Sequence, residues 1–188
     1  MTRAFLGTPV PPGVFDECVD TARRSPSAGN AQGWNLIVFT GDGTQRYWDI
    51  AFPVGNREGF AFPGLFAAPL VALVLADRRA YLDRYSEPDK AVQGLGESVE
   101  KWVAPYWTID ASFATMTLML ALHERGLGTL FFAHAHEQSL RGAFGVPDDV
   151  EILGVLAVGY PDTGREVPGR SAGRARRPAS GIIHHDRW

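Results

Sequence analysis

The densest group of chemically capable side chains in the sequence is a set of arginines near its C-terminal end. The segment GREVPGRSAGRARRP, residues 164–178, holds five guanidinium groups, at Arg165, Arg170, Arg174, Arg176 and Arg177. Arginine binds phosphate through paired, charge-assisted hydrogen bonds. A solvated tail is the alternative interpretation, whereas the apolar residues that follow and end in Trp188 favour a tail packed against protein. The segment therefore favours a phosphate-bearing cofactor without excluding the solvated tail.

The remaining candidate residues do not form a familiar catalytic set. Ser25 and Ser27 lie outside a G-x-S-x-G turn, and no histidine and acid complete a triad, which argues against a hydrolase. His134 and His136 are predicted to share one face of a strand, but no cysteine or acidic residue stands at zinc-ligand spacing. We therefore expect no metal site, and any chemistry requires a group that the side chains do not supply.

The glycines at 126 and 128 do not match a dinucleotide-binding turn. That fingerprint requires a strand, then glycines, then a helix, whereas these two follow a predicted helix and precede a predicted strand. A helix C-cap followed by a tight turn is the simpler interpretation. Backbone placed close to a flat ligand is the functional alternative.

Composition is that of one globular domain over residues 1–188, with 45% hydrophobic and 21% charged residues and therefore a sizeable core. The net charge of -3 gives no overall attraction to nucleic acid or anionic membranes. No apolar stretch approaches the ~20 residues that span a bilayer, and the N-terminus lacks the apolar core of a signal peptide. Together with a single cysteine, Cys18, these features predict a cytoplasmic protein that binds neither nucleic acid nor membrane.

The elements that would position these residues follow one another irregularly. Apolar patterns predict helices at 12–24, 44–52, part of 78–97, 108–126 and 137–145, and buried strands at 35–41, 69–77, 128–133 and 151–161. Residues 53–67 show no regular pattern. Because this order is not a repeated strand–helix–strand alternation, we expect an α+β fold in which helices pack on a mixed or antiparallel sheet.

The longest predicted helix is apolar on nearly every side. It starts near Thr108 or Asp110 and is stopped by Gly126. Apolar residues continue around it from Ile109 to Leu122. Such a helix needs burial on most of its faces, and a second subunit would cover part of it.

The segment SPSAGNAQGW, residues 25–34, resembles the PSxxNxQPW segment of the FMN-dependent nitroreductase family. As in that family, it follows an N-terminal amphipathic helix. The segments ERGLGT, FGVPDDVEILGVLAVGYP and RRPASGIIHHDRW resemble later parts of the family in the same order, so the likeness covers nearly the whole chain. It implies a nitroreductase-like α+β fold and an intertwined homodimer. The C-terminal arm, residues 162–188, would reach over the partner, and FMN would bind at each of two interface sites.

The resemblance also implies roles for individual residues. Ser25, Pro26 and Ser27 would lie beside the flavin of the partner subunit, where small side chains let the ring approach backbone, while Asn30 and Gln32 would organise the turn. The other cofactor-binding residues would be Arg174, Arg176 and Arg177 at the phosphate, and the backbone of Phe132, Ala133 and His134 facing the ring.

Arg3, in TRAF, resembles the end of the family's Arg-Ser-x-Arg-x-Phe opening. It would place a cation at the pyrimidine end of the ring, where positive charge favours reduction. The sequence departs from the family pattern in two ways. Gly33 replaces a proline, and the chain begins too late to contain the Arg and Ser that precede Arg3 in the family pattern. The second departure implies either a misassigned start codon or phosphate binding that depends on the tail.

The implied activity explains the missing catalytic set, because the isoalloxazine ring carries hydride and the protein supplies position and electrostatics. We expect an FMN-dependent oxidoreductase that takes hydride from NADH or NADPH and reduces a nitroaromatic, quinone or related small molecule by a ping-pong mechanism. The alternatives are a sibling activity, reductive dehalogenation or flavin fragmentation, and a non-catalytic flavin-binding or flavin-storage protein. The sequence neither names the acceptor nor chooses between NADH and NADPH.

Overall fold

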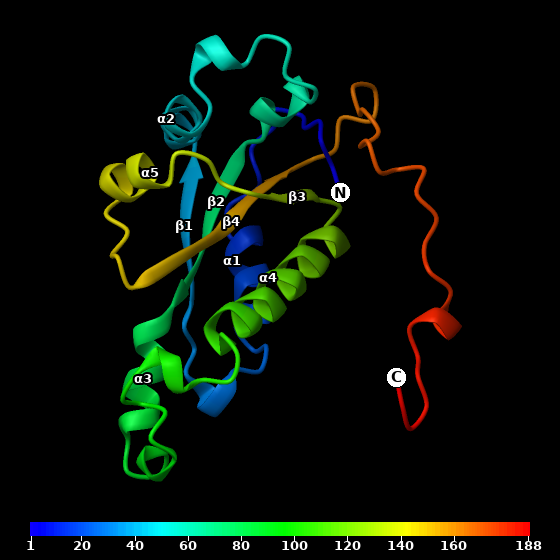
Figure 1. The fold of residues 1–188 in the computed structure, drawn as a ribbon. Coiled ribbons are helices and arrows are strands. Elements are labelled where there is room, and N and C mark those ends of the chain that lie inside the picture. The colour runs from blue at the N-terminus through cyan, green and yellow to red at the C-terminus, as the bar shows by residue number, and fades with distance from the viewer.

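A four-stranded antiparallel sheet forms the centre of the protein (Figure 1). The computed structural model describes residues 1–188. The strands are β1 (Trp34–Thr40), β2 (Leu70–Asp77), β3 (Gly128–Phe132) and β4 (Val150–Gly159), and they lie in the order β1-β2-β4-β3. The expected α+β fold is confirmed, and every strand pair in the sheet is antiparallel.

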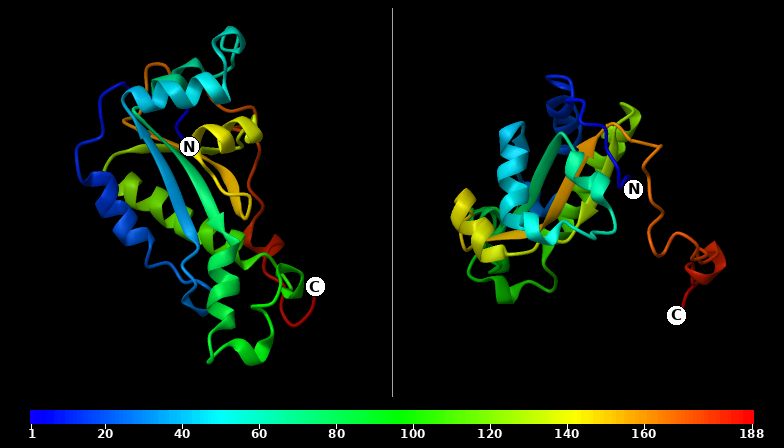
Figure 2. Two further views of the ribbon diagram at one scale, coloured as in Figure 1. Left: turned by 90° about the vertical axis from the view of Figure 1, so that its left-hand side faces the viewer. Right: turned by 90° about the horizontal axis from the view of Figure 1, so that it is seen from above.

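Helices cover both faces of this sheet (Figure 2). They are α1 (Val14–Ala22), α2 (Asp42–Ala51), α3 (Arg78–Ser86), α4 (Tyr106–Glu124) and α5 (Glu137–Phe144). On β2, Val71 and Leu73 pack with α2 and α5, while Ala72 and Val74 pack with α1 and α4. Because both faces are covered, β2 is a continuous apolar run instead of an alternating one. No helix has the length and apolar character needed to cross a bilayer.

Helix α1 packs on the sheet through residues at the predicted helical spacing. Phe15, Cys18 and Ala22 are buried in the cluster that α1 shares with α4 and the sheet. Cys18 is a free thiol. Burial raises the pKa of this thiol above its ordinary value.

Helix α4 begins at Tyr106, two residues before the earlier of the two predicted starts. Pro105 stands directly before it, and its missing N–H suits a helix start, where no intrahelical partner exists for that group. At the other end, Gly126 has φ +74°, and the N–H of Leu127 donates to the carbonyl of Leu122 at 3.0 Å. The predicted helix C-cap at Gly126 is therefore confirmed.

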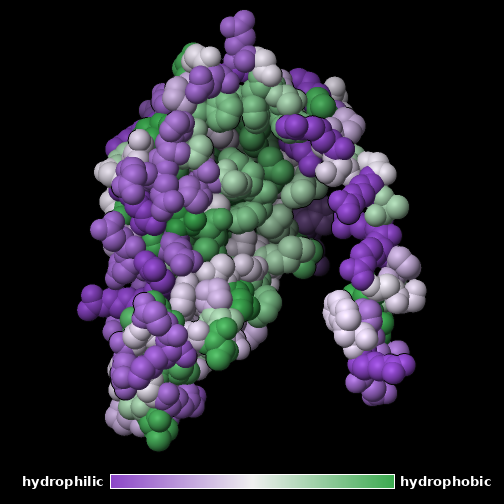
Figure 3. Space-filling view, in the orientation of Figure 1, coloured by the Kyte–Doolittle hydropathy of each residue, from purple (hydrophilic) through white to green (hydrophobic).

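One side of α4 is buried within the chain, and the other is not. Ala111, Ala114, Leu118 and Leu122 are among its buried residues. On the opposite side Phe113, Met116 and Leu120 are 51%, 52% and 56% exposed, and their spacing of three and four residues aligns them as one row, called the α4 stripe below. The face of the molecule around α4 is largely apolar (Figure 3). A single chain thus covers only part of the helix that was predicted to be buried on most faces.

The N-terminal residues run beside the start of β3 and the end of β4. The N–H of Thr2 donates to the carbonyl of Thr129, and the N–H of Leu6 donates to the carbonyl of Tyr160, each at 2.9 Å. At Gly128 a Cβ would overlap Oγ1 of Thr2. The close approach at this glycine is therefore to Thr2.

Residues 162–188 form an arm that runs away from the sheet (Figure 1). Its first part is attached to the N-terminus, because the Glu166 carboxylate accepts the N–H groups of Arg3 and Ala4 at 3.0 Å. Beyond residue 169, the backbone hydrogen bonds of the arm are local turns only. The apolar side chains of its final part, Ile182, Ile183 and Trp188, are exposed.

Candidate functional site

The loop between α1 and β1, residues 25–33, has a strained backbone. A short 3-10 turn, Ala28–Asn30, forms its middle. Gly29, Asn30 and Gln32 have φ of 60°, 57° and 56°, in the left-handed region. For Asn and Gln this conformation costs free energy, so it persists where surrounding structure fixes it. The N–H of Gln32 donates to Oγ of Ser27 at 3.1 Å and closes the turn.

Helices α3 and α4 hold this loop at three points. From the loop, Oγ of Ser25 donates to Oγ1 of Thr117 at 3.0 Å, and the N–H of Ala28 donates to Oδ2 of Asp110 at 2.8 Å. From α3, Nε of Arg84 donates to the carbonyl of Gly29, also at 2.8 Å. The turn residues predicted from the sequence are thus fixed by two helices that lie far along the chain.

Gly33 ends the loop at a point where no side chain fits. A Cβ at this position would lie 2.6 Å from the carbonyl oxygen of Asp77 and 2.6 Å from Cε2 of Tyr81. Real Cβ atoms do not approach other atoms so closely, because the overlap is strongly repulsive. The packing of Tyr81 and Asp77 therefore accounts for glycine at this position.

A cavity of about 120 Å³ opens beside the loop. Its lining includes Ser25, Pro26, Ser27 and Gln32 from the loop, together with Trp34, Tyr81 and Asp110. The indole Nε1–H of Trp34 is buried without a hydrogen-bond partner. Ligand pockets typically enclose ~300–1,000 Å³. The cavity beside the loop is therefore smaller than a typical ligand pocket.

A larger cavity of about 820 Å³, called the arginine cavity below, lies between the N-terminus, Phe62 and the arm. Its lining includes five arginines: Arg3, Arg170, Arg174, Arg176 and Arg177. The Arg3 guanidinium lies over the Phe62 ring, 5.4 Å from the ring centroid. Gly169 packs against Arg3, since a Cβ there would lie 2.5 Å from Nη2. The fold thus brings Arg3 together with arginines more than 160 residues away.

None of these five guanidinium groups takes part in an ion pair, although ion pairs form elsewhere in the chain. Arg165, for example, lies 2.5 Å from the carboxylate of Asp162 and does not line the cavity. Like charges gathered at one cavity repel one another and attract an anion. Because guanidinium groups donate paired hydrogen bonds to phosphate oxygens, this donor set fits a phosphate group.

Strand β3 ends at Phe132, before His134 and His136. Phe132 stacks on Trp48, with ring centroids 6.1 Å apart and planes 6° from parallel. His136 takes a left-handed φ of 55° at the N-cap of α5. The prediction that His134 and His136 share a strand face is therefore wrong, because the chain leaves the sheet before it reaches them. No three His, Cys, Asp or Glu side chains gather closely enough to hold a metal ion.

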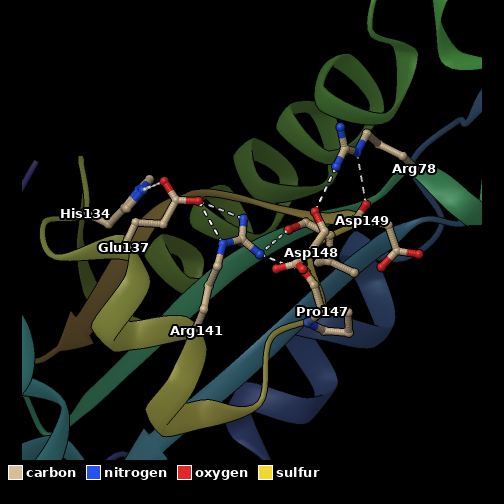
Figure 4. Close-up of polar contacts among 8 residues, drawn as sticks. Arg78, His134, Glu137, Arg141, Pro147, Asp148 and Asp149 are labelled. Atoms are coloured by element: carbon tan, nitrogen blue, oxygen red, sulfur yellow. Dashed lines mark hydrogen bonds and ion pairs between the residues drawn. The ribbon is translucent and has the colours of Figure 1, made fainter.

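A polar network holds the segment after β3 in place (Figure 4). Nε2 of His134 lies 3.3 Å from Oε2 of Glu137, and Nη2 of Arg141 donates to Oε1 of Glu137 at 2.7 Å. Arg141 also donates to the carbonyls of Pro147 and Val150, at 2.7 and 2.9 Å. The Arg141 guanidinium, followed by His134, holds the pKa of Glu137 below its ordinary value. The network ties the backbone after Phe132 to the turn before β4.

The loop residues and the cavity arginines line separate cavities within one chain. The loop contacts the first two-thirds of α4, at Asp110 and Thr117. The arginine cavity lies by the N-terminus, which pairs with β3 beyond the far end of α4 (Figure 1). The loop therefore lies along the first two-thirds of α4, whereas the arginine cavity lies beside the segment that pairs with the strand after its C-terminal end.

The residues that hold the loop were not identified from the sequence. Asp110 is the only charged residue in the apolar run from Ile109 to Leu122, and this isolated acid is a signal that could have marked it. Tyr81 and Arg84 lie in a polar segment without a distinguishing pattern. Their partners are 29 and 55 residues away, so only the fold reveals them.

Comparison with known proteins shows the same fold and sequence pattern elsewhere. The sequence model of the nitroreductase family matches residues 1–160. An NADH dehydrogenase from Thermus thermophilus is 27% identical, with 85% of this chain and 81% of that protein aligned. A 4-nitrobenzoate reductase from Pseudomonas putida is also 27% identical, over 97% and 89%.

Among solved structures, a protein from Exiguobacterium sibiricum in complex with FMN matches with a TM-score of 0.72 at 18% identity, covering 97% of this chain and 91% of that chain. At this identity the likeness shows the fold. The family match is what assigns the chain, because it spans most of the residues, including the loop and Arg3. The protein therefore belongs to the nitroreductase family of NAD(P)H oxidoreductases.

Proposed function

We propose that the protein binds FMN and uses NADH or NADPH to reduce a small organic acceptor, such as a nitroaromatic or a quinone, in a ping-pong cycle. The arginine cavity carries this proposal, because its five guanidinium groups have no ion-pair partner within the chain. The phosphate of FMN supplies the matching anion. The 4-nitrobenzoate reductase among the relatives and the FMN bound to a protein of the same fold support this choice.

In this proposal Arg174 and Arg176 hold the phosphate, with Arg177 beside them, and Arg3 places positive charge near the pyrimidine end of the ring. That charge favours reduction, because negative charge develops at the pyrimidine end of a reduced flavin. The backbone of 132–134, held by its polar network, faces the ring. Bound FMN supplies the hydride-transfer chemistry, and the protein supplies position and charge.

The loop provides the other wall of the proposed site. Ser25, Pro26 and Ser27 carry small side chains, which allow a planar ring to approach the backbone closely. Asn30 and Gln32 adopt the left-handed conformation that shapes the turn. The small cavity and the unpartnered indole N–H beside these residues are features that a polar, planar group can fill.

A homodimer would complete this site, because the loop of one chain could meet the arginine cavity of the other. The α4 stripe and the apolar end of the arm are exposed in one chain and would be covered by the partner. We therefore expect a homodimer. Light scattering at micromolar concentration should give twice the 20.5 kDa mass of one chain. A stable monomer would contradict the shared site.

The proposed activity is tested by a visible spectrum of the purified protein, followed by anaerobic addition of NADH or NADPH. We expect a yellow protein whose flavin absorbance bleaches. A yellow protein that neither donor bleaches favours flavin binding or storage without catalysis. A colourless protein that takes up no added FMN refutes the proposal.

The acceptor class is tested on the bleached protein. Oxidation by 4-nitrobenzoate or by a quinone should restore the yellow colour in a second half-reaction that is independent of the nicotinamide donor. Release of halide from a halogenated phenol, without oxidation by the other two acceptors, would instead favour reductive dehalogenation.

A further inference from the structure

We propose that Asp110 is a positioning residue, which holds the loop at 25–33 in the shape that receives the flavin. The identity of the ligand rests on the proposed function. The action of Asp110 rests on its hydrogen bonds and its burial, which are independent of any ligand.

Asp110 is a buried carboxylate without a cationic partner. Its side chain is 7% exposed in the second turn of α4 and forms no ion pair. Oδ2 accepts two hydrogen bonds of 2.8 Å, from the N–H of Ala28 and from Oη of Tyr81. Transfer of a carboxylate out of water is costly, and here only neutral donors offset that cost. A carboxylate in this environment is therefore not explained by packing alone.

Tyr81 fixes the direction of this carboxylate. Burial, and next the hydrogen bond to Asp110, raises the pKa of Tyr81 far above its ordinary value. Its hydroxyl therefore keeps its proton and donates. With Tyr81 on one side, the same oxygen of Asp110 remains aimed at the backbone of Ala28.

The position of these bonds in the loop is what links Asp110 to the flavin. Asp110 and Thr117 are seven residues apart on one face of α4, and they bind Ala28 and Ser25. Between Ser25 and Ala28 lie only two residues, both of which line the small cavity. The N–H of Ala28 is also the first donor of the turn that leads into the left-handed residues. Asp110 thus fixes one end of the segment proposed to contact the ring.

The experiment compares Asp110→Ala, Asp110→Asn and a matched control, Thr108→Val. The alanine removes both hydrogen bonds, whereas the asparagine keeps an oxygen that can accept both. The control removes a hydrogen bond of similar length from the same helix, between Oγ1 of Thr108 and Oε2 of Glu151 at 2.9 Å, without touching the loop.

Amide hydrogen exchange of the flavin-free protein is the first measurement. We expect peptides covering 25–33 to exchange faster in Asp110→Ala than in either other variant, while peptides from β2 and β4 keep their protection. If Asp110→Ala does not fold, Tyr81→Phe replaces it and should loosen the same peptides. If the loop exchanges at the same rate in Asp110→Ala, or in Tyr81→Phe where that replaces it, as in Thr108→Val, the inference is overturned.

Titration with FMN is the second measurement. We expect binding about tenfold weaker in Asp110→Ala, and within about threefold of the starting protein in Asp110→Asn and Thr108→Val. Equal loss in the alanine and asparagine variants overturns the inference, because hydrogen-bond geometry is then not the cause. If the unchanged protein binds no FMN, the proposed function fails, and the exchange measurement alone decides whether Asp110 holds the loop.

Discussion

The loop at 25–33 and the arm at 162–188 carry the two halves of the proposed FMN site, and they differ in how the chain fixes them. The loop makes hydrogen bonds to α3 and α4, and these keep its backbone in a strained, left-handed conformation. The arm carries four cavity-lining arginines after residue 169, and none of them forms an ion pair or a side-chain hydrogen bond. The loop is therefore held in shape by the fold, while the arm carries positive charges that have no partner within the chain.

This difference determines when each half loses conformational entropy. The loop loses its freedom when the protein folds, whereas the arginines lose theirs when phosphate or a partner chain binds. Changes in the loop should therefore alter the free energy of unfolding. Changes in the arm should alter ligand affinity and leave unfolding unchanged.

The largest expected effect is in the arm. Replacing Arg174 and Arg176 together by alanine should weaken FMN binding by about a hundredfold or more, since each charge-assisted interaction is worth about 1.5–3 kcal/mol. The urea midpoint of the flavin-free protein should not move. Arg187→Ala, from the same arm but outside the cavity, serves as the control. An unchanged dissociation constant in the double variant would place the phosphate elsewhere.

A methyl group at Gly33 tests the loop half. Gly33→Ala should lower the free energy of unfolding by about 1–3 kcal/mol, because the new Cβ overlaps Asp77 and Tyr81. Gly173→Ala is the matched change in the arm, where a Cβ meets nothing within 4 Å, and it should have no measurable effect on stability. Urea denaturation of both variants decides the comparison. Equal stabilities would show that the loop is no more tightly fixed than the arm.

Arg3 is at the N-terminus, yet it lines the arginine cavity together with residues of the arm. Replacing it tests whether this cavity holds only the phosphate or also reaches the flavin ring. If its charge lies near the ring, Arg3→Ala should lower the reduction potential of bound flavin by about 30 mV, equivalent to tenfold for a two-electron couple. Oxidised FMN should bind with little change. Potentiometry and FMN titration separate the cases: weaker binding at an unchanged potential would assign Arg3 to the phosphate.

The smallest expected effect is a difference in alkaline stability. Burial raises the pKa of Tyr47 and Tyr81 above the ordinary value of 10.0. The unfolded chain therefore ionises first, and this stabilisation is complete below pH 10 and is lost as the pH rises above it. Tyr81→Phe should reduce the loss by less than about 1 kcal/mol at about pH 10.5. The arm contains no tyrosine, so the double arginine variant should follow the unchanged protein in urea melts across this range.

Elements whose sequence carries its own signal were predictable. The apolar run that became β2, the helical spacing of Phe15 and Cys18, and the stop at Gly126 were each read correctly. The start of α4 was not, because Thr108 and Asp110 are residue types typical of a helix N-terminus, whereas the helix begins at Tyr106, directly after Pro105. The end of β3 was also missed: His134 and His136 were predicted to lie on a strand, whereas β3 ends at Phe132.

The candidate site was less predictable, because its geometry depends on contacts between distant residues. Family resemblance marked the loop and the arginines, but not what holds the loop. Tyr81 and Asp110 meet across 29 residues, and Arg3 meets the arm across more than 160. No local pattern encodes such pairs, since each depends on how α3, α4 and the N-terminus pack. The only local signal was Asp110, the single acid in the apolar run of α4.

The single cysteine gives the protein an internal reporter of its own motions. Cys18 lies between α1 and the sheet, and burial raises the pKa of its thiol. Because the thiolate attacks thiol reagents only when it is exposed, the labelling rate reports how often α1 separates from the sheet, at reagent concentrations where labelling outpaces reclosing. The denaturant dependence of that rate distinguishes local opening from global unfolding. The timescale of opening on the α1 face can therefore be measured without introducing any probe.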